Sequence, residues 1–226
     1  TEIYTLSLHD ALPIFRDDAV ITAGPSAVGP FIVTGGAAGT DYSYSEADKE
    51  LTINTTTPVT VSMRDEGTTT DSTIRILTDN GAADVTLDSV NIRTTEEWQA
   101  VMVTKSQAAE AYAPCTLRLK GTSTLRGEYQ SGHALRYYNE SLTITSEESG
   151  VLNVSNSGNN AAIHAQNGTN LTIQGNAVVN VTSEQHNGIN NCGLITINEN
   201  AQVTAAAGEE QSAIMSGNNT GEFREI

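Results

Sequence analysis

The basic and aromatic side chains that could contact a sugar gather in the middle of this chain. Six of the 11 Lys and Arg residues fall between positions 93 and 136, namely Arg93, Lys105, Arg118, Lys120, Arg126 and Arg136. Aromatic rings offer flat apolar faces for sugar rings, and guanidinium groups pair with the carboxylates of acidic sugars. The candidate carbohydrate-binding residues are therefore Trp98, Arg118, Lys120, Arg126, Arg136, Tyr137 and Tyr138.

A second interpretation of the same cluster stays open. Arg118 and Lys120 alternate with Leu117 and Leu119, so both basic side chains should point outward from a strand. They could then form part of a sugar-binding surface together with the nearby rings. They could equally neutralise a very acidic molecule, with the Tyr rings covering the edge of a coil.

The acidic residues suggest calcium as a possible cofactor. Glu147 and Glu148 form the candidate calcium site, and Asp84 with Asp88 and Glu209-Glu210 are alternatives. Calcium prefers clustered carboxylate and carbonyl oxygens. None of these pairs matches the spacing of a known calcium-binding loop, so solvated turns are the competing interpretation.

The sequence contains no recognisable catalytic signature. His133, His164 and His186 occupy unequal positions relative to the repeat described below, so we expect them in turns or on the surface and not at a shared metal site. There is no Gly-x-Ser-x-Gly motif, Gly-rich phosphate loop or paired-Cys metal spacing. No catalytic residue is therefore predicted.

The charge of the chain excludes one class of partner. Asp and Glu outnumber Lys and Arg by 27 to 11, which gives a formal net charge of −16. This field repels a polyanion, so nucleic acid is not an expected partner. Solubility outside the cell and affinity for calcium both remain as explanations of the acidity.

Sequence patterns typical of β-strands repeat along the chain, and these strands determine where the candidate side chains lie. Apolar–polar–apolar triplets occur in pairs, with the second usually starting eight residues after the first. The pairs are Leu51-Thr52-Ile53 with Val59-Thr60-Val61, Leu142-Thr143-Ile144 with Leu152-Asn153-Val154 (two residues further on), Leu171-Thr172-Ile173 with Val179-Asn180-Val181, and Ile195-Thr196-Ile197 with Val203-Thr204-Ala205. This alternation places apolar side chains on one face of a strand and Thr or Asn on the other.

A third strand completes each repeat. A small residue followed by an aliphatic one recurs at spacings of 28, 26 and 25 residues, at Ala134-Leu135, Ala162-Ile163, Gly188-Ile189 and Ala213-Ile214. A period in this range built from short strands is typical of a β-solenoid. The sequence therefore predicts an all-β fold, a right-handed parallel β-helix; an antiparallel sandwich would not give this recurrence.

Equivalent positions should stack in rows along the β-helix. We expect Thr143, Thr172 and Thr196 to form one outward row, and Asn153, Asn180 and Thr204 to form another. The stretch from Val85 to Val103 should supply one earlier coil, and Ser106 to Pro114 an inserted loop. Residues from about Gly29 to Asp79 should form irregular coils and an N-terminal cap, because an open coil end exposes unpaired backbone.

The two ends of the chain differ from the repeat. Residues 1–14, TEIYTLSLHDALPI, match the translation of a common short-read sequencing adapter, so we exclude them from the fold. Residues 15–28 are expected to be a disordered linker, and residues 29–226 a single β-helix domain that is truncated at its C-terminus. The chain would then be a metagenomic fragment of a larger multidomain protein, without a segment that inserts into a membrane.

The two cysteines are not expected to pair. Cys115 and Cys192 precede triplets that are three coils apart, and coils stack at about 4.8 Å. Their separation would be roughly 14 Å, whereas a disulfide requires Cα atoms within about 7 Å.

The repeat resembles that of bacterial β-helical proteins described as carbohydrate-binding-domain-containing, of the pectate-lyase-like superfamily. The matching stretches are FIVTGGAAGTDYSYS, LTINTTTPVTVS, DVTLDSVNI, LRLKGTSTLRG and NGTNLTIQGNAVVNVTS. This resemblance implies a secreted or surface-displayed module, and some members bind plant polysaccharides with calcium. Lyase members place a basic catalytic residue beside acidic calcium ligands, and no such carboxylate cluster is evident here.

Three functions follow as expectations. The first is a non-catalytic carbohydrate-binding or adhesin module, extracellular or on the cell surface, whose partner is a polysaccharide or a host glycan. The second is a polysaccharide lyase or hydrolase acting on uronic-acid-rich polymers, which would require carboxylates within reach of Arg118 or Arg126. The third is a structural stalk of a large surface protein.

Overall fold

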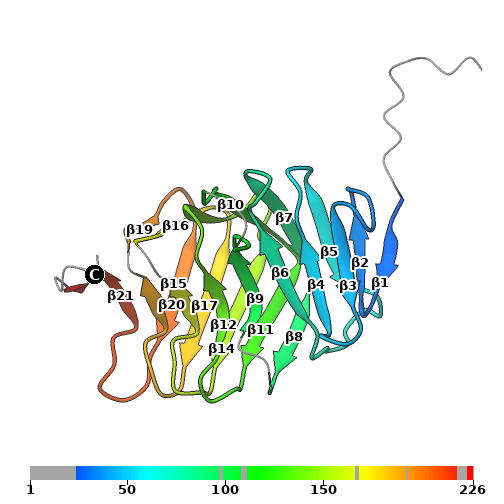
Figure 1. The fold of residues 1–226 in the computed structure, drawn as a ribbon. Helices are drawn as coiled ribbons and strands as arrows, with labels where there is room; N and C mark the ends of the chain where they lie inside the picture. Colours follow the sequence, from blue (N-terminus) through cyan, green and yellow to red (C-terminus); the bar gives the residue numbers. More distant parts are fainter. Residues whose placement is uncertain are drawn as a thin grey trace, which may run out of the picture.

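The structure is a computed structural model that describes residues 24–96, 99–107, 111–165, 168–191, 193–217 and 223–225. Short strands wind into six stacked coils, each contributing to up to three parallel sheets. Figure 1 shows the coils side by side along one axis, from β1 near one end to β21 near the other. The predicted parallel β-helix is confirmed. Among the described residues, no helix is long and apolar enough to cross a membrane.

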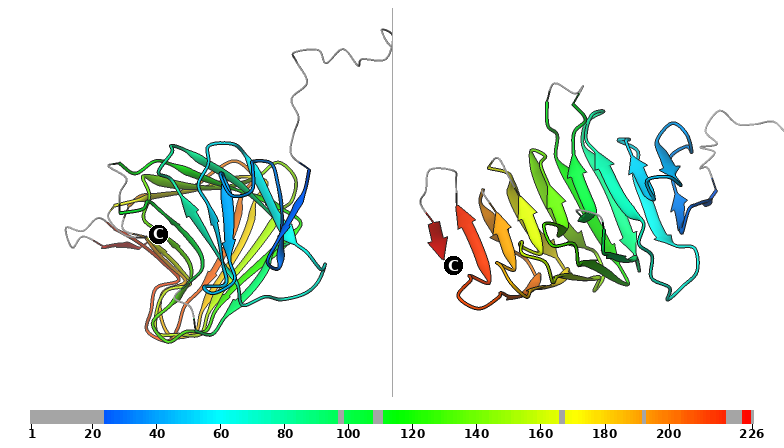
Figure 2. Two further views of the ribbon diagram at one scale, coloured as in Figure 1. Left: turned by 45° about the vertical axis from the view of Figure 1, so that its right-hand side comes forward. Right: turned by 60° about the horizontal axis from the view of Figure 1, so that its bottom comes forward.

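The strands fall into three sheets, seen around a common interior in Figure 2. Sheet A contains β1 (Ser26–Val28), β2 (Phe31–Thr34), β5 (Val59–Met63), β7 (Ala83–Asp88), β10 (Cys115–Lys120), β13 (Ser141–Ser146), β16 (Asn170–Gly175) and β19 (Ile195–Ile197). Sheet C contains β8 (Asn91–Thr94), β11 (Thr122–Gly127), β14 (Val151–Asn156), β17 (Val178–Ser183) and β20 (Gln202–Ala206). Sheet B contains β3 (Tyr42–Ser45), β4 (Glu50–Ile53), β6 (Thr73–Leu77), β9 (Gln99–Thr104), β12 (His133–Tyr137), β15 (Ile163–Ala165), β18 (Ile189–Asn191), β21 (Ile214–Gly217) and β22 (Phe223–Glu225).

Each regular coil contributes one strand to sheet A, then one to sheet C and then one to sheet B. The two triplets of the repeat form the first two strands, and the small–aliphatic pair lies at the start of the third. The coil of β7, β8 and β9 lies where the stretch from Val85 to Val103 predicts it. The loop predicted from Ser106 to Pro114 falls between β9 and β10, and its described residues carry no strand. Five coils therefore share this order, from β7 to β21.

Parallel pairing keeps equivalent residues in register and builds the core. Leu142 lies opposite Leu171, which lies opposite Ile195, and all three side chains point inward. Thr143, Thr172 and Thr196 stack outward in the same strands, as predicted. On sheet C, Asn180 donates a hydrogen bond from Nδ2 to Oδ1 of Asn153 across 3.0 Å, so the predicted Asn row is also confirmed. Burial of aliphatic side chains from every coil is the main stabilising contribution to this fold.

The N-terminal end is irregular and capped by antiparallel strands. β1 pairs with β2 and β2 with β5 in antiparallel fashion, and β3 pairs likewise with β4. These strands give the outer coil backbone partners that an open end would lack. The triplets at Leu51 and Val59 have the regular spacing but belong to sheets B and A, unlike later pairs. β1 also lies within residues 15–28, so the linker prediction is wrong for its last three residues; the adapter-like segment 1–14 lies outside the described residues.

Cys115 should be chemically inert in the folded protein. Its side chain is buried in β10 as a free thiol, and burial raises its pKa to about 12, with a smaller contribution from Asp84. The thiolate is the reactive form, so alkylation at pH 8 should be negligible until the protein unfolds. A variant with Cys192 replaced by serine isolates this thiol, and mass spectrometry before and after adding denaturant measures its labelling. Rapid labelling of the native variant would contradict this placement.

Candidate functional site

The structure distributes the predicted basic cluster over three faces of the β-helix. Arg118 and Lys120 lie on sheet A in β10, Arg126 lies on sheet C in β11, and Arg136 lies on sheet B in β12. The chain turns two corners between β10 and β12, so residues close in sequence point in different directions. The expectation of a single basic and aromatic surface is therefore wrong.

The two tyrosine candidates differ in their burial. Tyr137 is fully buried, and its hydroxyl donates a 2.6 Å hydrogen bond to Oδ1 of Asn191, two coils away. The prediction that its ring forms part of an exposed sugar-binding surface is wrong, because strand alternation with Leu135 directs it inward. Tyr138 is half-buried, with the guanidinium carbon of Arg136 4.5 Å from its ring centroid. Trp98 lies outside the described residues.

Sheet A brings Arg118 together with carboxylates from both neighbouring coils. Its Nε lies 2.9 Å from Oδ1 of Asp84, and its Nη2 lies 3.0 Å from Oδ2 of the same group. Its Nη1 lies 3.6 Å from Oε1 of Glu147. The hydrogen bond to Asp84 is the main cause that raises the pKa of Arg118, and a bidentate pair also fixes the guanidinium plane.

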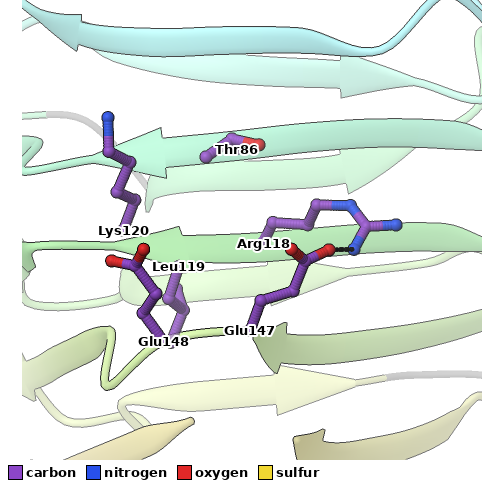
Figure 3. A pocket seen from close by; sticks show the side chains of 6 residues that line it. All are labelled: Thr86, Arg118, Leu119, Lys120, Glu147 and Glu148. Carbon is purple, nitrogen blue, oxygen red and sulfur yellow. Dashed lines mark ion pairs between the residues drawn. The ribbon is translucent and has the colours of Figure 1, made fainter. Parts of the chain in front are cut away.

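Lys120 repeats this arrangement two residues further along β10. Its Nζ lies 2.9 Å from Oδ2 of Asp88, which raises the pKa of the ammonium group. A hollow of about 200 Å³ lies beside these pairs, lined by Thr86, Arg118, Leu119, Lys120, Glu147 and Glu148. Figure 3 shows Glu147 and Glu148 reaching from the turn after β13 toward the outward side chains of β10. We call this the sheet A hollow.

The sheet A hollow corrects one interpretation of the sequence. No carboxylate cluster is evident beside the basic residues in the linear sequence, yet Asp84 and Asp88 lie next to them in space. Register explains the difference, because Thr116 lies opposite Asp84 and Lys120 opposite Asp88 in the adjacent strand. Aligning the coil that contains Val85 with the coil that contains Leu117 would have placed Asp88 opposite Lys120. It would also have placed Asp84 on the same outward face, two residues from the position opposite Arg118.

The calcium candidates have cationic neighbours in this arrangement. Glu147 faces the guanidinium of Arg118, and the charge of Glu148 acts on Lys120. Within the part of the chain that the structure describes, no group of three or more His, Cys, Asp or Glu residues is placed to hold a metal ion.

Sheet C carries a separate charge cluster around Arg126. Its Nε lies 2.5 Å from Oε1 of Glu128, and Nε of Arg93 lies 3.0 Å from the same atom. The hydrogen bond from Arg93, followed by the charge of Arg126, lowers the pKa of Glu128. Both arginines are exposed and already share this carboxylate, which fits the interpretation of charge neutralisation.

The histidines form a cluster that the sequence interpretation missed. The rings of His133 and His164 stack with centroids 4.4 Å apart and planes inclined by 10°. Burial lowers the pKa of His133 to about 3 and that of His164 to about 4, so both rings are neutral at pH 7. His133 is buried, so its expected place in a turn or on the surface is wrong. Coil register places Arg136 opposite His164 and His164 opposite Asn190, but it does not align the three histidines with one another.

No family model, curated protein or solved structure matches this chain.

Proposed function

We propose that the protein is a non-catalytic carbohydrate-binding module, displayed outside the cell, whose binding site is the sheet A hollow. The observation that carries this proposal is the fixed pairing of Arg118 with Asp84 and of Lys120 with Asp88 beside an open hollow. Each pair presents N–H donors and carboxylate acceptors together. A sugar hydroxyl both donates and accepts, so it can bridge such a pair.

The charges favour neutral sugars over acidic ones at this site. Arg118 is already compensated by Asp84 and Glu147, so an incoming sugar carboxylate would meet two nearby carboxylates. A hydroxyl group meets no such repulsion. This refines the initial expectation, in which the arginines pair with acidic sugars.

The surroundings of the hollow suit an extended ligand. The outward row through Arg118 continues with Thr86 on one side and Thr145 on the other, and the adjacent row contains Thr143 and Thr172. In the adjacent row, threonine hydroxyls recur in the successive strands β10, β13 and β16, at about 4.8 Å. Such a polar surface can contact several residues of one polysaccharide chain. The resemblance of the repeat to β-helical carbohydrate-binding proteins supports the same function.

Retention on insoluble neutral polysaccharides, such as cellulose, xylan and mannan, tests this function. The full chain should be retained, and Arg118→Gln should weaken retention about tenfold, as expected when one charge-assisted hydrogen-bond pair is lost. Arg93→Gln is the matched control, since it removes an arginine–carboxylate pair from sheet C. Failure of every polysaccharide to retain the chain would favour the structural stalk. Equal weakening by both variants would show that the sheet A hollow is not the site.

A polysaccharide lyase is a second candidate, because such an enzyme would require carboxylates within reach of Arg118 or Arg126. Asp84 lies 2.9 Å from Arg118 and Glu128 lies 2.5 Å from Arg126, so carboxylates are within reach of both arginines. Incubation with polygalacturonate, with and without calcium, separates the two functions. Ultraviolet-absorbing unsaturated products that disappear in Arg118→Gln would replace the binding proposal with a catalytic one.

A further inference from the structure

A second hollow, on sheet B, contains the histidines. Arg136, His164 and Asn190 occupy equivalent outward positions in the successive strands β12, β15 and β18. They line a hollow of about 310 Å³ together with Ser131, His133, Asn160, Ala161 and His186. Stacked coils thus bring one guanidinium, three imidazoles and two amides to the same place. We call it the sheet B hollow.

Arg136 differs from the other candidate basic residues in having no carboxylate partner. Arg118, Lys120 and Arg126 each form ion pairs, whereas no described residue forms a hydrogen bond or an ion pair with Arg136. Its guanidinium lies over the ring of Tyr138, and its Nε is buried without a partner. In a chain with a net charge of −16, this lack of a counter-ion is a specific feature of the hollow.

A second polar group in the sheet B hollow also lacks a partner. Nδ1 of His186 is buried and forms no hydrogen bond among the described residues. The large majority of buried side-chain polar atoms in native proteins have a hydrogen-bond partner. Two unsatisfied groups lining one hollow therefore point to a ligand that supplies both a negative charge and further hydrogen-bonding atoms.

Arg136 carries a positive charge in the sheet B hollow at pH 7. Burial lowers its pKa, which shows that its charged form has lost hydration without gaining a counter-ion. Burial holds the pKa of His133 at about 3 and that of His164 at about 4, so their rings are neutral there. Nδ1 of His133 must donate its 2.9 Å hydrogen bond to the carbonyl oxygen of Ala161, and this fixes its neutral tautomer.

We propose that the sheet B hollow binds a sugar acid, with its carboxylate on the guanidinium of Arg136 and its hydroxyls on His186, Asn160 and Asn190. A guanidinium group matches a carboxylate through two parallel hydrogen bonds. Imidazole and amide groups can each donate to or accept from a hydroxyl. The sheet B hollow lies on another face than the sheet A hollow, so this inference does not depend on the proposed function.

A carboxylate fits this environment better than a phosphate. One guanidinium compensates one negative charge, whereas a phosphate monoester carries about 1.5 to 2 negative charges at pH 7. The excess charge would add to the repulsion from an acidic protein. Several hydroxyls on the ligand would also use the amide and imidazole groups that a bare phosphate leaves unpaired.

Isothermal titration of the full chain with glucuronate, at pH 7 and constant ionic strength, tests this proposal. Glucose is the matched neutral sugar, and inorganic phosphate is the matched anion without a sugar ring. We expect glucuronate to bind at least tenfold more tightly than either. The proton resonances of the His164 and His186 rings should shift with glucuronate and saturate at the same concentration.

Variants of two arginines in the same outward row complete the test. Arg136→Met should weaken glucuronate binding at least tenfold, and Arg136→Lys should weaken it less, because it keeps the charge but loses the planar fork. Arg75→Met is the control, since Arg75 lies in the same row but pairs with Glu50 at 2.8 Å. Thermal unfolding checks that each variant is folded. Glucuronate binding no tighter than that of glucose or phosphate, or unchanged in folded Arg136→Met, would overturn the proposal.

Discussion

Gly150→Ala is expected to lower the free energy of unfolding by about 2–3 kcal/mol, although it adds a single methyl group. Gly150 lies at the corner between β13 and β14, and a Cβ atom there would lie 2.4 Å from the carbonyl oxygen of Leu119 and 2.6 Å from its carbonyl carbon. These are backbone atoms of the preceding coil, which cannot rotate away. The coils would have to separate locally, and the parallel hydrogen bonds on both sides would weaken.

Gly24→Ala is the matched control for this substitution. A Cβ atom at Gly24 meets no other atom within 4 Å, and its backbone does not require a positive φ angle. Urea unfolding should therefore separate the two variants, with an accompanying fall in the melting temperature of about 4–12 °C for Gly150→Ala alone. Equal stabilities would show that the corner has room for a side chain and that the coil spacing there is wrong.

The same constraint operates at two other described corners of the β-helix. Gly158 lies between sheets C and B, where a Cβ atom would lie 2.3 Å from the carbonyl oxygen of Tyr129. Gly193 lies between sheets B and A, where the corresponding distance to the carbonyl oxygen of Thr169 is 2.4 Å. Close backbone stacking thus explains why small residues interrupt the triplets. These corners direct the outward side chains of each coil toward three different faces.

The strands themselves were predictable because two periods act together in the sequence. Alternation identifies inward residues such as Leu171 and Ile173, and recurrence after about 25 residues identifies their partners in the next coil. Both patterns follow from parallel pairing in register, so the regular coils after Val85 matched the prediction. The N-terminal triplets at Leu51 and Val59 also form strands, and the irregular cap was expected. Its antiparallel pairing was not predicted, because antiparallel strands at the cap have no recurrence in the sequence.

The candidate site was harder to predict because it depends on contacts between coils. Asp84 and Arg118 are 34 residues apart, and this separation exceeds the later repeat length because a loop is inserted after β9. Counting by a constant period therefore fails at this coil. Proximity in sequence also led to the wrong expectation that Arg118 and Arg136 share one surface. They are 18 residues apart, yet they lie on different sheets. Arg118 and Lys120 were placed correctly because strand alternation alone determines that they point outward.

Acidification from pH 7 to pH 4 is expected to destabilise the protein by on the order of 3 kcal/mol through His133 alone. Burial, reinforced by the charge of His164, holds the pKa of folded His133 at about 3, whereas an unfolded histidine has a value of about 6.5. Between these values the unfolded chain binds a proton that the folded chain does not. Stability is therefore fully present above pH 6.5 and is lost as the pH falls toward 3.

His133→Asn isolates this contribution, because asparagine can still donate to the carbonyl oxygen of Ala161 but does not titrate. The measurement is the free energy of unfolding in urea at several values between pH 4 and pH 7. Carboxylates such as Glu128 add their own pH dependence to both proteins, so the informative quantity is the difference between their slopes. We expect the wild-type free energy to fall more steeply than that of the variant over the whole range. Parallel curves of the free energy of unfolding against pH would mean that His133 is protonated as readily in the folded state as in the unfolded one. Its ring would then not be buried against the ring of His164.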